Sequence, residues 1–389
     1  MITKIKQLAE SIFDEVVTIR RHLHKYPELS FKEHKTSAYI KSVLSSWNIP
    51  FTEDIADTGI VVLLKGNNPS SKTIALRADF DALPIIEDNE VDYCSVNNGV
   101  MHACGHDAHT ASLLGAINIL NTLRKEWEGS IKFIFQPAEE MLPGGAQQMI
   151  IEGVLENPKV EKMLGQHVFP DLEAGKVGFR PGKYMASTDE LHITIKGKGG
   201  HAALPEKYNS PLLAAAKLIT ALDEYSMKEK DRPCVLAIGF IEGLGSTNVI
   251  PEQVKLKGTL RAMDEDFRMK THDKILAIAN TIAEMYSLTI DFDIRKGYPF
   301  LVNHETLTKK SISFAKEYMG TENVIDLPIR MTAEDFSYYS HEVPSCFYRL
   351  GTANKSKGIT HGLHTSRFNI DESSLKSGMG LMAYLAIKN

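Results

Sequence analysis

The sequence predicts an α/β protein in which a larger domain, with a mainly parallel mixed sheet flanked by helices, is interrupted by a smaller ferredoxin-like α+β domain. Three observations predict this class. The chain has 389 residues, more than one small domain contains. Before Ser187, apolar strands alternate with amphipathic helices, which is typical of a mainly parallel sheet. After Ser187, strands that alternate polar and apolar residues indicate a sheet covered on one face.

Hydrophobic spacing defines the elements before Ser187. Apolar residues three to four apart predict one helix over residues 2–25, which Tyr26-Pro27 ends. Short apolar runs bounded by turn-forming residues predict strands. These criteria predict further helices over 36–47, 108–124 and 146–152, and strands over 59–65, 73–79, 130–136 and 163–167.

The segment 187–295 has the order strand-helix-strand-strand-helix-strand, which is ferredoxin-like. Its predicted elements are strands over 190–196, 234–241, 253–261 and 287–294, and helices over 211–225 and 267–284. The α/β pattern returns after Tyr298, and the elements predicted there are a helix over 305–319 and a strand over 345–351. The simplest organisation inserts this segment between 1–186 and 296–389. Three consecutive domains are the alternative, which would leave a thin last domain.

Composition narrows the range of functions. The formal net charge is −5 and the pI is about 6.3, so the chain lacks the basic surface that nucleic-acid or anionic-membrane binding requires. Its four cysteines are scattered and form no CxxC pair, which favours a reducing compartment. The first ten residues lack the apolar core of a signal peptide, and no long apolar run follows. We therefore expect a cytoplasmic protein that binds neither nucleic acid nor membranes.

The densest group of chemically active side chains is Met101–His109. It contains three histidines, a cysteine and an aspartate, at a predicted junction of loop and helix. The thiolate of Cys104 and the imidazole of His106 suit zinc, manganese, cobalt or nickel. The alternative is a capped helix start, with Asp107 near the N-cap and solvated histidines. The number of potential ligands favours a metal site.

Two adjacent carboxylates, Glu139 and Glu140, follow the predicted strand 130–136. Ligands of open α/β sheets bind at the carboxyl ends of strands. Adjacent side chains diverge, so Glu140 can bind a metal ion while Glu139 faces a water and acts as general base. The alternative is a helix N-terminus, where acidic side chains interact favourably with the helix dipole.

Other candidates lie at strand ends and in a late loop. His167 ends a predicted strand and His364 lies in a Gly-containing loop. A single histidine in either position is more often a structural residue than a metal ligand. With the two groups above, the two histidines complete a set of N, S and O ligands for two metal ions about 3.5–4 Å apart. Asp79 and Asp81 alternate onto one face after the strand 73–79. They could orient ligand histidines or form an ordinary acidic turn.

In the inserted domain, three polar residues are candidates for substrate contacts. His201 follows the glycines of Gly197–Gly200 and could donate a hydrogen bond to a developing oxyanion. Asn248 and Arg261 could hold a substrate carboxylate, and arginine suits a bidentate pair. A structural role remains the alternative for each.

Taken together, the motifs resemble the M20 metallopeptidase family, in particular its amidohydrolase branch, which includes hippurate hydrolases, N-acyl-amino-acid amidohydrolases and auxin-conjugate hydrolases. The resemblance covers nearly the whole chain, and Cys-Gly-His-Asp with Pro-Ala-Glu-Glu is a specific combination. The motifs that carry it, in the family's order, are Met101–His109, Gln136–Glu140, His167, Gly197–Pro205, Thr247–Pro251, Met331–Phe336 and Leu363–His364.

The resemblance implies two divalent metal ions and a catalytic domain interrupted by a lid domain that often mediates dimers, so we expect a homodimer or higher homo-oligomer. Glu139 matches the general base, and His201 matches a lid histidine that reaches a neighbouring subunit's site. Asn248 and Arg261 match lid residues that hold substrate carboxylates. The implied metal ligands are Cys104, His106, Glu140, His167 and His364.

The chain departs from the family's pattern in three places. Where the wider family has His-x-Asp, this chain has Asp79-Phe-Asp81. That difference is consistent with the amidohydrolase branch, which uses the Cys-Gly-His cluster instead. Thr332 replaces a small residue, often Gly, and Thr365-Ser366 replaces a frequent Ser-Pro. Neither of these removes a ligand, but both could change the shape of the acyl or leaving-group pocket.

These residues predict a metal-dependent amidohydrolase or metallopeptidase. A water bridged by two metal ions (Zn, Mn, Ni or Co) would lose its proton to Glu139 and attack the amide carbonyl of a small N-acyl amino acid or similar conjugate. The products would be a carboxylic acid and a free amino acid. The alternatives are a dipeptidase or carboxypeptidase of the same family, a hydrolase with Cys104 as nucleophile, and an inactive metal-binding protein.

Overall fold

The computed structural model describes residues 1–229 and 232–389, and the chain divides into two compact units. Unit 1 comprises Met1–Gly182, Val302–Pro328 and Asp335–Asn389, and unit 2 comprises Lys183–Leu301 and Ile329–Glu334. The boundaries predicted from the sequence lie after residues 186 and 295, and the return of 329–334 to unit 2 was not anticipated. The chain leaves unit 1 within β7 (Gly182–Met185) and re-enters it within β14 (Leu301–Asn303).

Unit 1 is built on a mixed sheet of eight strands. These are β1 (Phe51–Ile55), β2 (Gly59–Lys65), β3 (Thr73–Asp79), β4 (Ser130–Gln136), β5 (Lys162–Glu173), β6 (Val177–Phe179), β15 (Val324–Asp326) and β16 (Ser345–Ala353). Their order is β1-β2-β4-β3-β5-β16-β6-β15. The pairs β4/β3, β3/β5, β5/β16 and β6/β15 are parallel, and the other three are antiparallel. The predicted mainly parallel mixed sheet is confirmed.

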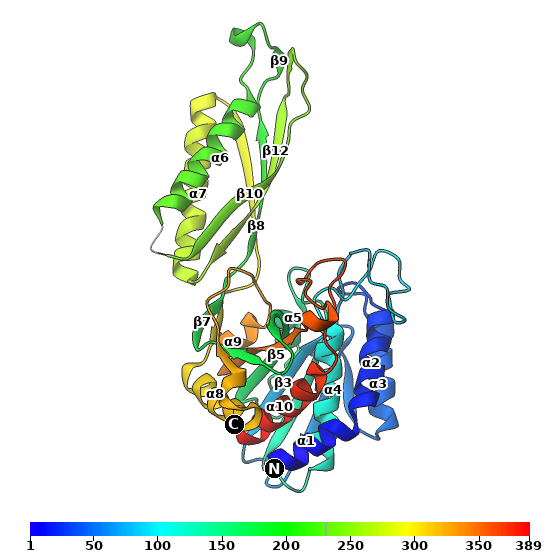
Figure 1. The fold of residues 1–389 in the computed structure, drawn as a ribbon. Helices are drawn as coiled ribbons and strands as arrows, with labels where there is room; N and C mark the ends of the chain where they lie inside the picture. The colour runs from blue at the N-terminus through cyan, green and yellow to red at the C-terminus, as the bar shows by residue number, and fades with distance from the viewer. Residues whose placement is uncertain (230–231) are drawn as a thin grey trace. The chain divides into compact units, whose positions relative to one another are not determined.

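Helices flank this sheet. They are α1 (Ile2–Ser11), α2 (Phe13–Lys25), α3 (His34–Ser46), α4 (His106–Thr122), α5 (Gly145–Ile151), α8 (Glu305–Met319), α9 (Ser337–Glu342) and α10 (Ser374–Lys388). Helices α2 and α10 pack against α4, and α1 packs against α10 (Figure 1). Every residue of β3 and β4 is buried, which explains why these strands have apolar runs rather than alternation.

The predicted single helix over 2–25 is wrong, because the structure has two helices that meet at Ile12. The backbone of Ile12 leaves the helical region, with φ −102° and ψ 5°. Helix α1 packs against α10, whereas α2 packs against α4. Apolar spacing continues across Ile12 because both helices bury one face, so the spacing hides the bend.

Several elements of unit 1 are not predicted from the sequence. Strands β1, β6 and β15 are short, and β5 continues to Glu173, beyond the predicted 163–167. Helix α10 is longer, but it buries residues on nearly all sides, including Leu375, Met379, Leu381 and Leu385. A helix that is apolar all round lacks the one-sided pattern by which helices are recognised.

Unit 2 is an antiparallel sheet with two helices. Its main elements are β8 (Asp189–Lys196), α6 (Pro211–Lys228), β10 (Cys234–Glu242), β12 (Gln253–Ala262), α7 (Glu265–Tyr286) and β13 (Thr289–Lys296). The strand order β10-β12-β8-β13 is the ferredoxin-like order expected from the sequence. A separate two-stranded sheet pairs β9 (Gly200–His201) with β11 (Val249–Ile250).

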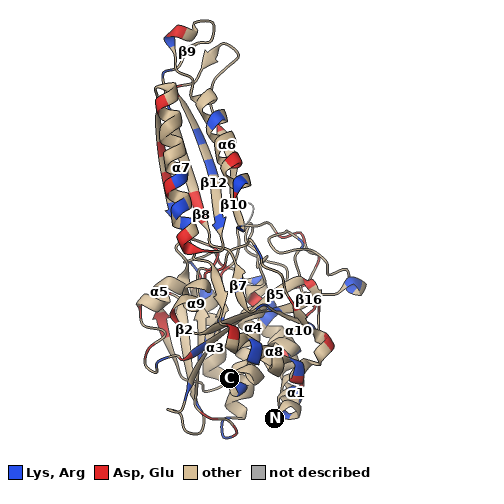
Figure 2. Ribbon diagram, turned by 90° about the vertical axis from the view of Figure 1, so that its left-hand side faces the viewer, with Lys and Arg blue, Asp and Glu red and all other residues tan. Residues whose placement is uncertain are grey.

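The helices of unit 2 are amphipathic. Helix α7 buries Phe267, Thr271, Ile275 and Ile282, which lie four or seven residues apart and so share one face of the helix. Charged residues of both signs occur along α6 and α7 (Figure 2). Among the residues that the structure describes, no helix combines the length and apolar character that crossing a membrane requires.

Candidate metal centre

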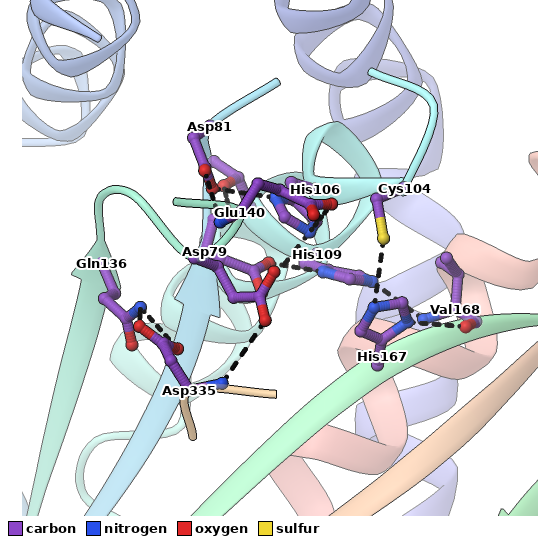
Figure 3. Close-up of polar contacts among 12 residues, drawn as sticks. Asp79, Asp81, Cys104, His106, His109, Gln136, Glu140, His167, Val168 and Asp335 are labelled. Carbon is purple, nitrogen blue, oxygen red and sulfur yellow. Dashed lines mark hydrogen bonds and ion pairs between the residues drawn. The ribbon is translucent and has the colours of Figure 1, made fainter. Parts of the chain in front are cut away.

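The candidate metal ligands of unit 1 gather at one edge of its sheet. Asp79 ends β3, Glu139 and Glu140 follow β4, and His167 lies in β5. These three strands are parallel neighbours, so their carboxyl ends meet at the same edge. Helix α4 begins there with His106. Figure 3 shows the side chains of Asp79, His106, Glu140 and His167 converging with Cys104. The sheet edge therefore explains why ligands from separate motifs come together.

A sharp turn at Gly105 separates the two ligands of the Cys-Gly-His motif. Gly105 is the N-cap of α4 and has φ +82°, a left-handed conformation that favours glycine. A Cβ atom there would lie 2.4 Å from Cγ2 of Val168. Glycine thus allows the turn to pack directly against β5, which carries His167.

His106 has one ring nitrogen held and the other available. Its Nδ1 lies 3.0 Å from Oδ1 of Asp81, and its buried Nε2 has no hydrogen-bond partner among the described residues. Burial alone would lower the pKa of His106, but the carboxylates of Asp79 and Asp81 raise it to about 10. The same negative charges would also attract a metal ion. Because Nδ1 of His106 is bound to a carboxylate, Nε2 is the atom that remains to bind the metal.

The other two histidines also direct Nε2 toward Cys104. In His167, Nδ1 donates to the carbonyl of Val168 at 2.7 Å, and Nε2 lies 3.5 Å from Sγ of Cys104. Burial lowers the pKa of His167 well below its ordinary value, which keeps the neutral form that binds metals. In His364, Nε2 lies 3.3 Å from the same Sγ and 3.2 Å from Oε1 of Glu140.

The ligand atoms form two overlapping groups that share one thiol. One contains Cys104, His106 and His167, and the other contains Cys104, Glu140 and His364; within each, the atoms lie within 4.8 Å of one another. Burial and the charges of Glu140 and Glu139 raise the pKa of Cys104 well above its usual range, because they disfavour the thiolate. A bound cation would stabilise the thiolate at this position. These N, S and O donors fit two divalent ions of the zinc, manganese, cobalt or nickel type.

Asp79 and His109 link this centre to β5. Nδ1 of His109 lies 2.6 Å from Oδ1 of Asp79, and Nε2 of His109 accepts the N–H of Val168 at 2.8 Å. Both ring nitrogens are therefore engaged, which excludes His109 as a ligand in this arrangement. Asp81 supports two ligands, because its Oδ2 accepts the backbone N–H of Glu140 at 2.9 Å in addition to its contact with His106.

Glu139, the predicted general base, lies beside the ligands. Its carboxylate forms a further close group with His106 and Glu140, and it is 7% exposed. Its Oε1 accepts the backbone N–H of Asp335 at 3.4 Å. Glu139 is thus mostly buried and has a donor on its carboxylate.

A network that holds Asp335 was not anticipated from the sequence. Arg77, 1% exposed, donates to Asp79 at 2.6 Å and to Asp335 at 2.7 Å. Nε2 of Gln136 donates to Oδ2 of Asp335 at 2.8 Å (Figure 3). A signal for it existed, since an arginine within a buried apolar strand requires carboxylate partners.

The three candidates in unit 2 lie at two distant places within it. His201 pairs with Val249 across β9 and β11, and the carbonyl of Asn248 accepts the N–H of Ala202 at 3.0 Å. Arg261 lies near the far end of β12 and donates to the hydroxyls of Thr188 and Thr259.

Asn248 and Arg261, both expected to contact a substrate carboxylate, lie far apart within the chain. Asn248 precedes the start of β12, and the extended strand from Gln253 to Arg261 spans roughly 25 Å. Within a single chain, the two side chains are too far apart to share a carboxylate. His201 and Asn248, by contrast, lie together.

Comparisons with known proteins agree with this geometry. The sequence profile of peptidase family M20/M25/M40 matches residues 75–388. The chain is 37% identical to N-acetyl-L-cysteine deacetylase of Bacillus subtilis over 363 residues, 93% of this chain and 85% of that protein. It is 35% identical to thermostable carboxypeptidase 2 of Saccharolobus solfataricus over 393 residues, 100% of this chain and 98% of that one.

A solved structure is similar over the same length. It is a Bacillus subtilis protein described as a dinuclear metal binding peptidase from the M20 family, 32% identical, with a TM-score of 0.81. The match covers 97% of this chain and 98% of that one. The chain therefore belongs to peptidase family M20/M25/M40 and is a hydrolase that acts on amide or peptide bonds.

Proposed function

We propose that the protein hydrolyses the amide bond of small N-acyl amino acids or similar conjugates and releases a carboxylic acid and a free amino acid. The observation that carries this proposal is the carboxylate of Glu139 beside five converging ligand side chains. A mostly buried carboxylate at that position can accept a proton from the water that attacks the substrate. The 37% identity to a deacetylase of N-acetyl-L-cysteine supports an N-acyl amino acid as substrate.

The proposed cofactors are two divalent ions (Zn, Mn, Ni or Co), held by Cys104, His106, Glu140, His167 and His364. The similar Bacillus subtilis structure, described as binding two metals, supports this number. When bound, such ions polarise a carbonyl and acidify a water. Asp81 orients His106, and Val168 orients His167, through their Nδ1 atoms.

The steps assigned to side chains begin with Glu139. It accepts a proton from the attacking water and then delivers it to the nitrogen of the leaving amine. The backbone N–H of Asp335 helps to fix its carboxylate during both transfers. We propose that His201 donates to the developing oxyanion of a neighbouring subunit's substrate, with Asn248 beside it. Arg261 lies far from both along β12. The Arg261 that binds the carboxylate of this substrate would therefore belong to a different chain from that His201 and Asn248, as in a homodimer.

A dipeptidase or carboxypeptidase is the second candidate, because the carboxypeptidase of Saccharolobus solfataricus matches the whole chain at 35% identity. It would use the same centre with a different pocket. A Cys104 nucleophile is disfavoured, since a reactive thiol needs a lowered pKa and burial raises that of Cys104. The four cysteines are free, which supports our proposal of a cytoplasmic location.

The deciding experiment is hydrolysis of a panel of N-acyl amino acids and dipeptides, with and without EDTA and with each metal restored. We expect turnover to vanish with chelator and to return with metal, and the best substrate to be an N-acyl amino acid. A dipeptide preferred over all acyl amino acids would favour the second candidate. Turnover that resists the chelator would move the assignment to Cys104.

The role of Glu139 is tested by Glu139→Gln, which keeps the shape and removes the basic carboxylate. We expect kcat to fall by about 10²–10⁴-fold or more, while the metal content stays that of the wild type. Metal content is measured by atomic emission on the same samples. Near wild-type kcat in a metal-loaded Glu139→Gln enzyme would exclude Glu139 as the base.

A further inference from the structure

We propose that Glu33 is a positioning residue for the general base: its carboxylate holds the backbone turn at Ala138 from which Glu139 projects. The inference rests on the proposed function, because that function assigns Glu139 as the base. Glu33 lies immediately before α3, 105 residues from Ala138 in the sequence, and is fully buried.

Three segments of unit 1 converge on the carboxylate of Glu33. Its Oε1 accepts the backbone N–H of Ala138 at 2.9 Å and that of Phe31 at 2.9 Å. Its Oε2 accepts the hydroxyl of Thr58 at 3.2 Å. None of these three donors lies within a β-strand, so the carboxylate links loop segments that are far apart in the sequence.

The backbone at Ala138 needs such support. Its φ is +53°, a left-handed conformation that is unfavourable for a residue with a Cβ atom. Ala138 is fully buried, so its N–H requires an acceptor within the protein. Strained residues of this kind persist where the surrounding structure fixes them, and they cluster at active sites. Here the acceptor that fixes the turn is Glu33.

The position of this turn links it to Glu139 more than to the ligand Glu140. Glu140 has its own anchor, because its backbone N–H donates to Asp81 at 2.9 Å. Ala138 and Glu140 are thus each held by a buried carboxylate, and Glu139 lies between them. Loss of Glu33 leaves the buried N–H of Ala138 without its acceptor, although the carbonyl of Ala138 still accepts from the N–H of Gly145 at 3.0 Å. Asp81 continues to hold the metal ligand on the other side of Glu139. We therefore expect proton transfer to suffer while metal binding persists.

The test compares Glu33→Ala with a matched control, Glu28→Ala. Glu28 lies in the same segment, and its Oε2 accepts the N–H and the hydroxyl of Thr36 in α3, at 2.8 and 2.9 Å. The control therefore removes carboxylate hydrogen bonds near the start of α3 without touching the turn at Ala138. Both metal-loaded variants are assayed for kcat and KM on the best substrate, for metal content, for Tm, and for amide hydrogen exchange over residues 137–140.

We expect Glu33→Ala to lower kcat by about ten-fold or more, with KM and metal content near wild type and with faster exchange over 137–140. Glu28→Ala should keep kcat and this exchange rate even if its Tm falls equally. Glu33→Gln should keep kcat near that of the wild type, because its amide oxygen can accept from the N–H of Ala138. Burial and the charge of Asp81 raise the pKa of Glu33 to about 7, which makes a neutral amide a close substitute.

Three results would overturn the role of Glu33. They are equal kcat in Glu33→Ala and Glu28→Ala, unchanged exchange over 137–140, and a kcat loss explained entirely by lost metal. Should Glu33→Ala not fold, Glu33→Asp, which shortens the side chain by one methylene and so draws the carboxylate back from Ala138, replaces it and is compared with Glu33→Gln. An inactive wild-type enzyme would instead overturn the proposed function, and this role with it.

Discussion

The imidazoles of the candidate centre illustrate how one buried contact decides what a side chain can do. His106 and His109 both contact an aspartate through Nδ1, at 3.0 and 2.6 Å. His109 also accepts the N–H of Val168 with Nε2, whereas Nε2 of His106 has no partner among the described residues. The same residue type therefore serves as a link in one place and as a ligand candidate one helical turn earlier.

Substitution of Asp81 tests this arrangement. Asp81 contacts Nδ1 of His106 and also accepts from the Ser30 hydroxyl at 2.7 Å and from the N–H of Glu140. Asp81→Ala should lower metal affinity by about 10–100-fold, because His106 and Glu140 lose their orientation. Asp81→Asn, which keeps an acceptor, should be intermediate. Titration with a competing chelator measures both, and wild-type affinity in Asp81→Ala would contradict the assignment of these ligands.

At the scale of elements, the turn into α4 determines the spacing of the centre. Gly105 places Cys104 before the helix and His106 in its first turn, and it packs against Val168 of β5. The sequence places this junction correctly as loop followed by helix, and only the alternative interpretation of a capped helix start put Asp107 near the N-cap. The N-cap is Gly105, because only glycine tolerates both the positive φ and the contact.

Gly105→Ala should therefore destabilise the protein and weaken metal binding. The matched control is Gly153→Ala, since Gly153 has nearly the same φ, +83°, but a Cβ atom added there would meet no other atom within 4 Å. We expect a loss of about 1–2 kcal/mol in the control and a further loss of about 1–3 kcal/mol in Gly105→Ala, from overpacking against Val168. Urea unfolding and metal titration measure these effects. Equal losses in the two variants would show that the contact is unimportant.

A buried ion pair joins α7 to the sheet of unit 2. Arg268 and Asp189 both have fully buried side chains, and Nε2 of His272 lies 2.6 Å from the same carboxylate. Burial would raise the pKa of Asp189, but hydrogen bonds from Arg268 and His272 lower it to about 2. A carboxylate whose pKa is lower in the folded state stabilises the fold above about pH 4. That stabilisation is lost as the pH falls through about 2.

Asp189→Asn should accordingly lower the free energy of unfolding by about 3–5 kcal/mol at neutral pH, since Arg268 would keep a buried charge with one fewer ionic partner. The gap to the wild type should narrow between about pH 4 and 2. Urea unfolding across this range is the measurement. Asp293→Asn, which changes an exposed carboxylate on β13, is the control and should show little difference. A gap independent of pH would contradict the ionic explanation.

At the scale of the whole molecule, each unit has its own hydrophobic core. One cluster of buried residues belongs to unit 1 and includes Leu76, Phe133, Leu164 and Tyr348, and another belongs to unit 2 and includes Ile193, Leu218 and Ile275. All five proposed metal ligands belong to unit 1. Metal binding should therefore stabilise one unit selectively, because a ligand stabilises the structure that binds it.

Removal of metal with EDTA should accelerate amide hydrogen exchange in α4, which begins with a ligand, and leave exchange in α7 unchanged. Exchange protection reports the stability of each region separately. Mass spectrometry of peptides from residues 106–122 and 265–286 compares the two helices in the same sample. Restored metal should reverse the effect. Equal acceleration in both helices would show that the units unfold together.

The fold class and most long elements could be predicted from the sequence alone, and the sequence also supplies the candidate ligands and the candidate base. Periodicity and strand-end chemistry depend on residues a few positions apart, so they are visible in the local pattern of the chain. The ligand set stays a prediction until metal is measured, and the structure adds that these side chains lie together.

The way in which distant segments meet became visible only in the folded chain. The fold bends the first helix at Ile12, joins Arg77 to Asp335 across 258 residues, brings Glu33 to Ala138 and separates Asn248 from Arg261 along β12. Such contacts arise because buried charges and buried backbone N–H groups must find partners wherever packing places them. No local pattern specifies which partner that is, and this is why Glu33 left no signal in the sequence while the motif at Cys104 did.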